Sequence, residues 1–137
     1  MPGSPDVQKI EIKKVVTRND FALWCNMNSN EFWGFDEQKH FHLITEGKMI
    51  CMLAFTGGEC VATSQILNDG GAAAFEFGYA LPEYRQKGID IALYQYTIRH
   101  AFESGVRFVL GWAHPAFTPL TYNIFKSLGF KAVASVD

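Results

Sequence analysis

The sequence lacks the features that mark several large classes of protein. No apolar run approaches the ~20 residues of a membrane-spanning helix, and no signal-peptide pattern opens the chain. No long run of one charge occurs, and the formal net charge is −2. A surface for nucleic acid or for an anionic membrane is therefore not indicated. These absences favour a cytoplasmic protein that binds neither nucleic acid nor membrane.

Cysteine is also scarce. Cys25, Cys51 and Cys60 are odd in number and lack the spacing of metal ligands, so no metal site is expected. We interpret them as reduced, mostly buried thiols, as is usual in the cytosol.

Apolar and aromatic residues, in contrast, are plentiful. The chain has 137 residues, of which 48% are hydrophobic and 15% aromatic, which suffices for one domain with a real core. We expect a single domain over residues 7–137, preceded by a disordered segment over residues 1–6.

The first part of the chain predicts a strand followed by two helices. Apolar and charged residues alternate over residues 9–16, which is typical of a half-buried strand. Thr17 and Asp20 have the spacing of a capping box, so a helix should follow, and the run after Met27 should end it. Asp36 is placed to cap a second helix that stops before Gly47.

The middle predicts a β-meander, and the pattern then changes to a helical one. Strands are expected over residues 49–55, 60–67 and 72–81, separated by glycine-containing turns. Over residues 89–104, polar residues four apart form one solvated stripe, which predicts a largely buried helix. The stripe consists of Gln95, Arg99 and Glu103, and the remaining faces carry Leu93, Tyr96, Ile98, Ala101 and Phe102.

The last part predicts a strand, a helix and a final strand. Residues 107–114 are apolar enough for a central strand, and Thr118-Pro119 is a good start for a helix that runs to Ser127. Residues 131–136 form the expected last strand. The order βααβββαβαβ indicates an α+β fold with helices on both faces of one mixed sheet, whose strand–helix–strand unit makes two strands parallel.

A tight polar turn is the most informative local feature. Residues 85–88 read Arg-Gln-Lys-Gly and lie directly between an expected strand and an expected helix. Such a turn directs several backbone N–H groups and the positive end of a helix dipole at one spot, which suits a phosphate or pyrophosphate. An ordinary solvated turn is the alternative interpretation of this motif.

The turn, its lead-in and a later Leu-Gly-Phe ending together resemble the GNAT acyltransferase superfamily. The lead-in is Leu81-Pro82-Glu83-Tyr84, the turn continues to Ile89-Asp90, and the later helix closes on residues 125–130, which read Phe-Lys-Ser-Leu-Gly-Phe. The resemblance covers the chain from about Lys9 onward. It implies transfer of an acyl group, most simply acetyl, from acetyl-CoA to a primary amine of a small molecule, amino acid or peptide, without a metal.

The resemblance also implies where coenzyme A binds. Backbone amides of the turn would hold the pyrophosphate, and the strand before the turn would pair with the pantetheine arm. The residues carried over are Gly78, Tyr79, Ala80, Leu81, Arg85, Gln86, Lys87, Gly88, Ile89 and Asp90, with Thr118 and Phe125 on the later segment. The simpler interpretation of Thr118 is a helix cap.

Asp90 departs from the family pattern, which prefers Gly or Ala at this position. A carboxylate about 5 Å from a pyrophosphate would be repelled by very roughly 1–3 kcal/mol. Asp90 is therefore expected either to cap the helix and point away from the ligand or to weaken binding of the donor.

Acetyl transfer needs a base for the amine and an acid for the leaving thiolate. Glu76 and His114 are the candidate bases, with a solvent-facing strand residue and a hydrogen-bonded loop histidine as the respective alternatives. Phe125 occupies the position where the family often has a tyrosine acid, and Tyr122 lies one turn earlier on nearly the same face. Tyr122 is the candidate acid, unless it simply packs in the helix.

The acceptor is expected to contact the connection between the first two helices. Phe32, Trp33 and Phe35 lie there beside acidic residues, which suits a cationic amine; anchoring of the loop to the core is the alternative.

Two other functions stay open at this stage: a non-catalytic acyl-CoA-binding module, and a partner-dependent subunit. The family usually has one more strand at the C-terminal end, so a homodimer that supplies it is also open.

Overall fold

In the computed structural model, residues 9–28, 36–76, 78–85, 88–111 and 119–131 are described. The strands are β1 (Glu11–Lys14), β2 (Met49–Thr56), β3 (Glu59–Asp69), β4 (Ala72–Glu76) and β5 (Phe108–Gly111). The helices are α1 (Arg18–Asn28), α2 (Glu37–Thr45), α3 (Ile89–Glu103) and α4 (Pro119–Ser127), with a short 3₁₀ helix at Pro82–Tyr84. The expected order is therefore confirmed up to α4, and the expected last strand lies almost wholly outside the described residues.

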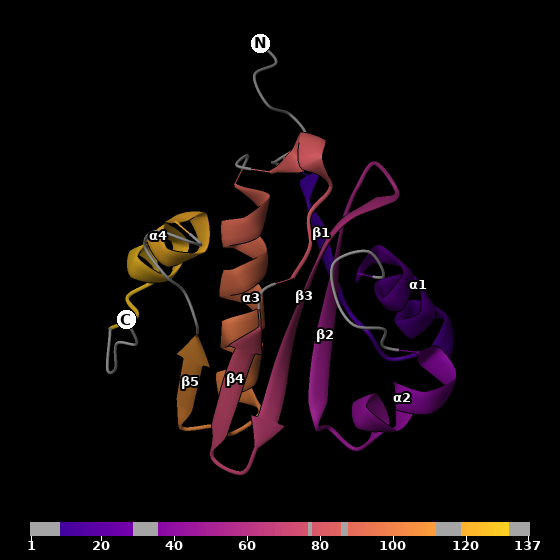
Figure 1. The fold of residues 1–137 in the computed structure, drawn as a ribbon, viewed down its shortest axis with the longest axis horizontal. Coiled ribbons are helices and arrows are strands. Elements are labelled where there is room, and N and C mark those ends of the chain that lie inside the picture. Colours follow the sequence, from indigo (N-terminus) through magenta and orange to yellow (C-terminus); the bar gives the residue numbers. More distant parts are fainter. Residues whose placement is uncertain (1–8, 29–35, 77, 86–87, 112–118, 132–137) are drawn as a thin grey trace.

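The strands form one sheet in the order β1-β2-β3-β4-β5 (Figure 1). The first four strands are antiparallel neighbours, and β4 and β5 are parallel. Helix α3 makes the crossover that parallel strands require. The sheet is therefore mixed, as expected.

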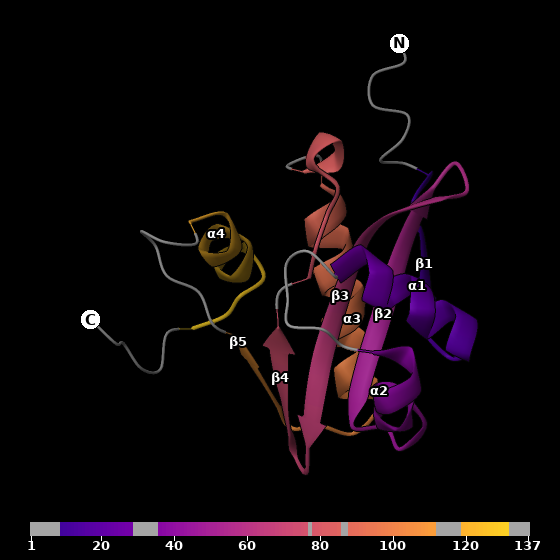
Figure 2. The ribbon, with the colours of Figure 1, turned by 45° about the vertical axis from the view of Figure 1, so that its right-hand side comes forward.

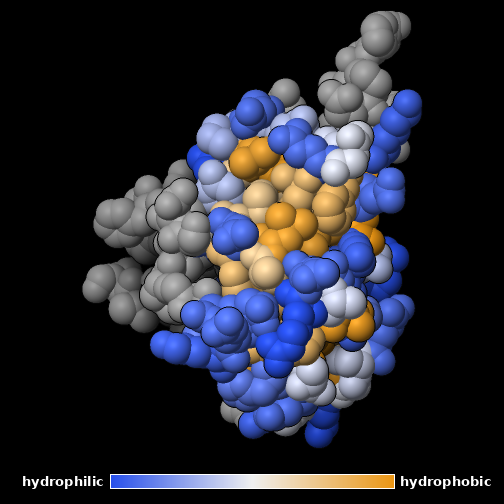
Figure 3. All heavy atoms as spheres, turned by 90° about the vertical axis from the view of Figure 1, so that its right-hand side faces the viewer, coloured by the Kyte–Doolittle hydropathy of each residue, from blue (hydrophilic) through white to orange (hydrophobic). Residues whose placement is uncertain are grey.

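The helices cover both faces of this sheet, as the turned view makes clear (Figure 2). Helices α1 and α2 pack with one core cluster, which contains Phe21, Trp24 and Leu53. Helices α3 and α4 pack with the other cluster, which contains Leu93, Phe125 and Ile66. The side of the molecule that faces right in Figure 1 shows an apolar area with mainly polar side chains below it (Figure 3).

Local signals place the helix starts. The backbone N–H of Asp20 donates to Thr17 Oγ1 over 3.0 Å, and Asp20 accepts from the N–H of Thr17 over 3.4 Å, so the capping box is confirmed. Asp36 accepts from the N–H groups of Gln38 and Lys39 at the start of α2. These caps satisfy amides that a helix leaves unpaired at its first turn.

One expectation about burial is wrong. Phe102 and Tyr96 on α3 are 48% and 37% exposed, because the buried stripe of this helix carries Thr97 in their place. The apolar pattern alone does not fix how a helix is rotated. Among the described strands, β5 lies at the edge of the sheet, and its central position stays a prediction because residues 132–136 of the expected last strand lie outside the described residues.

Candidate functional site

Strand β4 does not continue to Leu81 as expected. It ends at Glu76, opposite Gln65 of β3, and pairing resumes only at a bridge between Ala80 and Ala62. The N–H of Thr63 donates to Tyr79 O over 2.7 Å, and that of Leu81 donates to Val61 O over 2.9 Å. In an antiparallel pair the intervening residue, Ala80, then turns its N–H and C=O toward the other edge.

Gly78 sits in this break, where there is no room for a side chain. A Cβ atom on Gly78 would lie 1.7 Å from the carbonyl oxygen of Thr63. Thr63 also uses its side chain here: its Oγ1 accepts from the N–H of Tyr79 over 3.1 Å and donates to Asn28 Oδ1 over 3.2 Å. The break is thus held by Thr63 on the neighbouring strand.

The described pairing of β4 with β5 ends close to the break, at Phe75 and Gly111. An aromatic cluster fills the α3 side of this position. The Tyr94 ring meets Phe75 edge-on with centroids 4.6 Å apart, and Phe125 lies so close to Gly111 that a Cβ there would be 2.6 Å from its ring. The hydroxyl of Tyr94 reaches past the last strand pair, since the backbone of Gly78 hydrogen-bonds it.

Helix α3 begins shortly after the segment that follows the break. Its N-cap is Gly88, with φ 87°, a residue without a side chain to cap the helix. Among the described residues, the first amides of α3 therefore have no side-chain cap, at the positive end of the helix dipole. A positive φ is a conformation that glycine adopts easily and other residues rarely.

Arg85 connects the turn to residues 78–81, which follow the break and have no strand beside them on the β5 side among the described residues. Its Nε donates to Ala80 O over 2.9 Å, and its guanidinium lies 5.4 Å from the centroid of the Tyr79 ring. Asp90 is partly buried, and burial raises the pKa of its carboxyl group while the charge of Arg85 opposes this rise. Asp90 thus does not project freely into solvent, and Arg85 partly compensates its charge.

The described contacts bring many of the expected donor-site residues together. Gly78, Tyr79, Ala80, Arg85 and Asp90 are connected through the hydrogen bonds and charges above. Phe125 joins them through the Tyr94 ring, at 6.3 Å between centroids. Leu81 follows Ala80 directly in the chain, and Gly88 and Ile89 lie at the start of α3.

Other expected residues are placed only in part. Glu76 is described as the last residue of β4, and Tyr122 is half-buried on α4. Phe32, Trp33, Phe35, Gln86, Lys87, His114 and Thr118 lie outside the described residues. The roles expected of all these residues stay predictions.

Sequence reasoning missed several polar residues next to the break. Asn28, Thr63 and Gln65 are at least 95% buried on the side of α1, and Gln65 Oε1 has no hydrogen-bond partner among the described residues. Tyr94, on the opposite side, is 6% exposed. Polar residues that alternate in a half-buried strand, such as Thr63 and Gln65, were the signal that could have found the first group.

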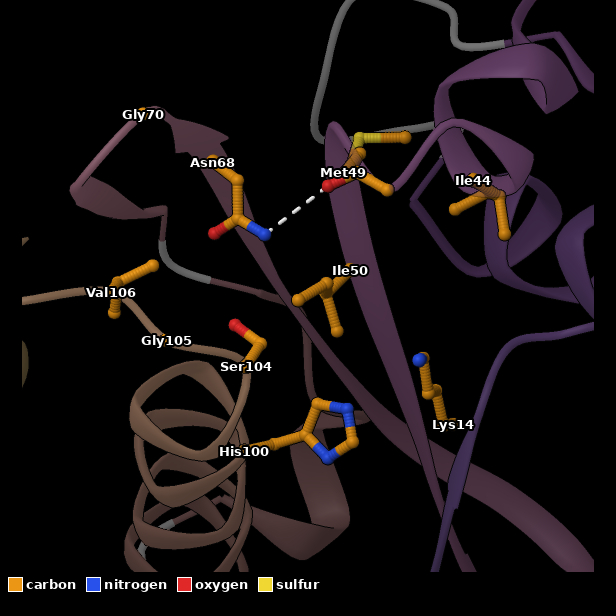
Figure 4. Close-up of a pocket in the computed structure, with 11 residues that line it drawn as sticks. Lys14, Ile44, Met49, Ile50, Asn68, Gly70, His100, Ser104, Gly105 and Val106 are labelled. Carbon is orange, nitrogen blue, oxygen red and sulfur yellow. Dashed lines mark hydrogen bonds between the residues drawn. The ribbon is translucent and has the colours of Figure 1, made fainter.

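A separate cavity of about 390 Å³ lies at the other end of α3 (Figure 4). Lys14, His100, Ser104 and Asn68 are among its lining residues, and Asn68 Nδ2 donates to the carbonyl oxygen of Gly47 over 3.1 Å. Burial, and next the charge of Lys14, lower the pKa of His100. This cavity is distant in sequence and position from the turn at Gly88, so it is not the expected donor site.

The described ranges of the chain contain no group of three or more His, Cys, Asp or Glu residues placed to hold a metal ion. The three cysteines are free: Cys51 is buried, while Cys25 and Cys60 are partly buried. Burial raises the pKa of Cys25 and of Cys60 to about 11, so neither is an activated nucleophile. None of the described helices is long and apolar enough to cross a membrane.

Comparison with solved structures supports the fold. The aminoglycoside N-acetyltransferase AAC(6')-Iy, in complex with a bisubstrate analogue, has a TM-score of 0.76 at 16% identity, over 93% of this chain and 95% of that one. AAC(6')-Ih from Acinetobacter baumannii gives 0.72 at 20% identity, over 93% and 95%. A predicted acetyltransferase from Clostridium acetobutylicum, solved with acetyl-CoA, gives 0.72 at 14% identity, over 93% and 96%.

Comparison of sequences identifies the family. No protein of curated function matches the sequence significantly. The sequence profile described as "Acetyltransferase (GNAT) family" matches residues 18–130, which include the β4 break, the turn at Gly88 and the Leu-Gly-Phe ending. The chain therefore belongs to the GNAT family and is an acetyl-CoA-dependent N-acetyltransferase.

Proposed function

We propose that this enzyme acetylates a primary amine of a small molecule, and that aminoglycosides are the first acceptor class to test. The observation that carries the proposal is the break in β4 beside the end of the described β4–β5 pairing, with the uncapped start of α3 next to it. Solved structures of similar fold include an acetyltransferase in complex with sisomicin, which is why aminoglycosides come first. Amino acids and peptides are the other candidate acceptors.

The proposed donor site uses mainly backbone groups. Amides of the segment from Gln86 to Asp90 hold the pyrophosphate of acetyl-CoA, and Gly78 to Leu81 pair with the pantetheine arm along their edge that faces away from β3. Arg85 now donates to Ala80 O, a carbonyl that the arm would need. On binding, Arg85 therefore exchanges this carbonyl for a phosphate oxygen, a charge-assisted bond that is stronger than the neutral one. Thr118 and Phe125 border the arm.

The proposed chemistry uses one group as a base for the acceptor amine and a different group to assist the leaving thiolate. Glu76 or His114 accepts the proton of the acceptor amine, whose nitrogen then attacks the thioester carbonyl. Near Tyr79 and Ala80, the backbone N–H of Ala80 points away from β3 and is the candidate that stabilises the resulting oxyanion, because the N–H of Tyr79 already donates to Thr63 Oγ1. The carbon–sulfur bond then breaks, with its electron pair on sulfur, and a tyrosine hydroxyl from the side of α3 and α4 assists the leaving thiolate; Tyr122 of α4 is the tyrosine that the sequence predicts for this role.

The acceptor is proposed to approach from the side of α1. Asn28 and Gln65 are polar and buried there, and Gln65 Oε1 needs a hydrogen-bond donor, which an amine or hydroxyl of the acceptor supplies. Phe32, Trp33 and Phe35 are proposed to contact the acceptor's cationic groups.

Release of coenzyme A, followed with a thiol reagent, tests this function. The full chain is incubated with acetyl-CoA and, in separate reactions, with aminoglycosides, polyamines, amino acids and short peptides. Release that saturates with one amine class, together with an acetylated product in mass spectrometry, is expected. Gln65→Ala should raise KM for that amine more than KM for acetyl-CoA, and absence of release with every class would contradict the proposal.

A further inference from the structure

Phe125 occupies the position where the family usually has the residue that assists the leaving thiolate. Phenylalanine has no hydroxyl group, so it cannot donate a hydrogen bond to sulfur. Phe125 is 6% exposed, stacks on Phe130 with centroids 4.7 Å apart, and meets Phe75 edge-on at 5.7 Å. It also lies against Gly111 of β5. Phe125 is thus a fixed part of the aromatic cluster, and another donor has to serve the thiolate.

Tyr94 of α3 brings a hydroxyl to the place where the strands part. Its ring lies against Phe75, which forms the last described β4–β5 pair with Gly111. Its hydroxyl is hydrogen-bonded by the backbone of Gly78, three residues further along the chain, inside the break. Tyr94 therefore spans from the end of the strand pairing to the break itself.

The hydrogen bonds and charges around this hydroxyl keep its proton available. Gly78 contributes a backbone N–H, so the tyrosine oxygen is the acceptor and its own O–H is not used in that bond. Burial, and then the negative charge of Asp90 one turn earlier, raise the pKa of Tyr94 above its ordinary value. The phenol therefore stays protonated and acts as a hydrogen-bond donor across the pH range of an assay.

We propose that Tyr94, rather than Tyr122, donates the hydrogen bond that stabilises the leaving thiolate of coenzyme A. This rests on the proposed function. When the carbon–sulfur bond breaks, the electron pair stays on sulfur, and the Tyr94 hydroxyl hydrogen-bonds it. The proton that the amine gives to Glu76 or His114 reaches the sulfur through solvent, and Tyr94 keeps its own.

The positions of the other buried polar groups agree with this assignment. Tyr94 belongs to the core on the side of α3, whereas Thr63 and its partner Asn28 lie on the side of α1. The thiolate would thus be served from one face of the sheet and the amine from the other. The two groups then do not compete for the same space.

Steady-state kinetics of Tyr94→Phe test the proposal. The phenylalanine keeps the ring contacts with Phe75 and loses only the hydroxyl, so we expect kcat to fall on the order of 100-fold. KM for acetyl-CoA should stay within about threefold, because the lost interaction forms only as the thiolate leaves. Tyr96→Phe, on the exposed side of the same helix, is the matched control and should leave kcat unchanged.

Two further measurements separate a role in the reaction from a role in folding. Fluorotyrosine at position 94 keeps the shape and the hydroxyl, and as a stronger donor it should retain or raise kcat. Calorimetry of Tyr94→Phe with acetyl-CoA should show unchanged affinity. A Tyr94→Phe variant with wild-type kcat, or one that loses only affinity or stability, would overturn the assignment.

The outcomes also distinguish this proposal from the proposed function. If the wild-type chain releases no coenzyme A with any amine, the proposed function fails and the role of Tyr94 fails with it. If the wild type turns over, Tyr94→Phe is unaffected and Tyr122→Phe is slow, only the assignment to Tyr94 is overturned.

Discussion

Gly78 is the residue on which the geometry of the β4 break depends. We predict that Gly78→Ala lowers the free energy of unfolding by about 3 kcal/mol or more, because the added Cβ would meet the Thr63 carbonyl and the backbone must shift. Gly71→Ala is the matched control: its Cβ would be 3.5 Å from Arg107 Cδ, an ordinary contact. Urea denaturation of both variants checks this, and equal losses would contradict it.

Asp90 is the residue that departs most clearly from the family pattern. The folded protein holds the proton of this carboxyl more tightly than the unfolded chain does, so the charged form destabilises the fold above the raised pKa. Asp90→Asn should therefore stabilise the protein at neutral pH. It should also bind acetyl-CoA about fivefold or more tightly, because a repulsion of about 1 kcal/mol or more is removed.

The gain in affinity should shrink as the pH is lowered toward the pKa of Asp90, where the wild-type carboxyl is itself neutral. Calorimetry at several pH values measures this. Unchanged or weaker binding by Asp90→Asn at neutral pH would show that the carboxylate does not oppose the donor.

At the scale of elements, a buried hydrogen bond links α3 to the sheet. Thr97 Oγ1 donates to Leu93 O over 2.7 Å, so it accepts from Ser64 Oγ of β3, which is 2.6 Å away. We predict that Thr97→Val costs about 1–3 kcal/mol of stability, because it leaves the Ser64 hydroxyl buried without its partner.

A double-mutant cycle isolates this contribution. Ser64→Ala combined with Thr97→Val should cost less than the sum of the single variants, with a coupling of about 1 kcal/mol. Thermal or chemical denaturation of the four proteins measures it, and strict additivity would mean that the two hydroxyls do not interact.

Local patterns predicted the elements well, because their causes lie within a few residues. The capping box at Thr17 and Asp20 and the cap at Asp36 follow from neighbouring residues, and both are confirmed. The break in β4 could not be predicted in this way. It depends on the carbonyl of Thr63, which belongs to a different strand.

The rotation of α3 explains the other errors. Tyr94 and Tyr96 are two residues apart in an apolar helix, and periodicity did not decide which of them faces the sheet. Contacts with the sheet decide it: Thr97 hydrogen-bonds Ser64 of β3 and Tyr94 packs on Phe75 of β4, which leaves Tyr96 and Phe102 exposed. The residues around the candidate site were predictable only as far as the family motif reaches, from the β4 strand to the start of α3.

At the scale of the whole molecule, His100 links stability to pH. Its folded pKa lies below the ordinary value of 6.5, so the unfolded chain binds its proton more readily. The contribution of neutral His100 to the free energy of unfolding is fully present above pH 6.5, and it is lost as the pH falls toward the pKa of His100 in the folded protein. The groups that act on it are Lys14, which lowers its pKa further, and Glu103, which opposes this.

We therefore predict that the wild-type protein loses more stability than His100→Gln when the pH falls from about 7 to about 5. Urea denaturation at each pH measures the two curves. Parallel curves would show that His100 has the same pKa in the folded and unfolded chains.

The central claim is that the turn at Gly88 and residues 78–81 beyond the β4 break bind acetyl-CoA, and isothermal titration calorimetry tests it most directly. The wild-type chain is titrated with acetyl-CoA beside Gly88→Trp and Gly105→Trp, two glycines with positive φ at opposite ends of α3. The account predicts saturable binding by the wild type and by Gly105→Trp, and none by Gly88→Trp. Absence of binding by the wild type, or equal binding by all three proteins, would contradict it.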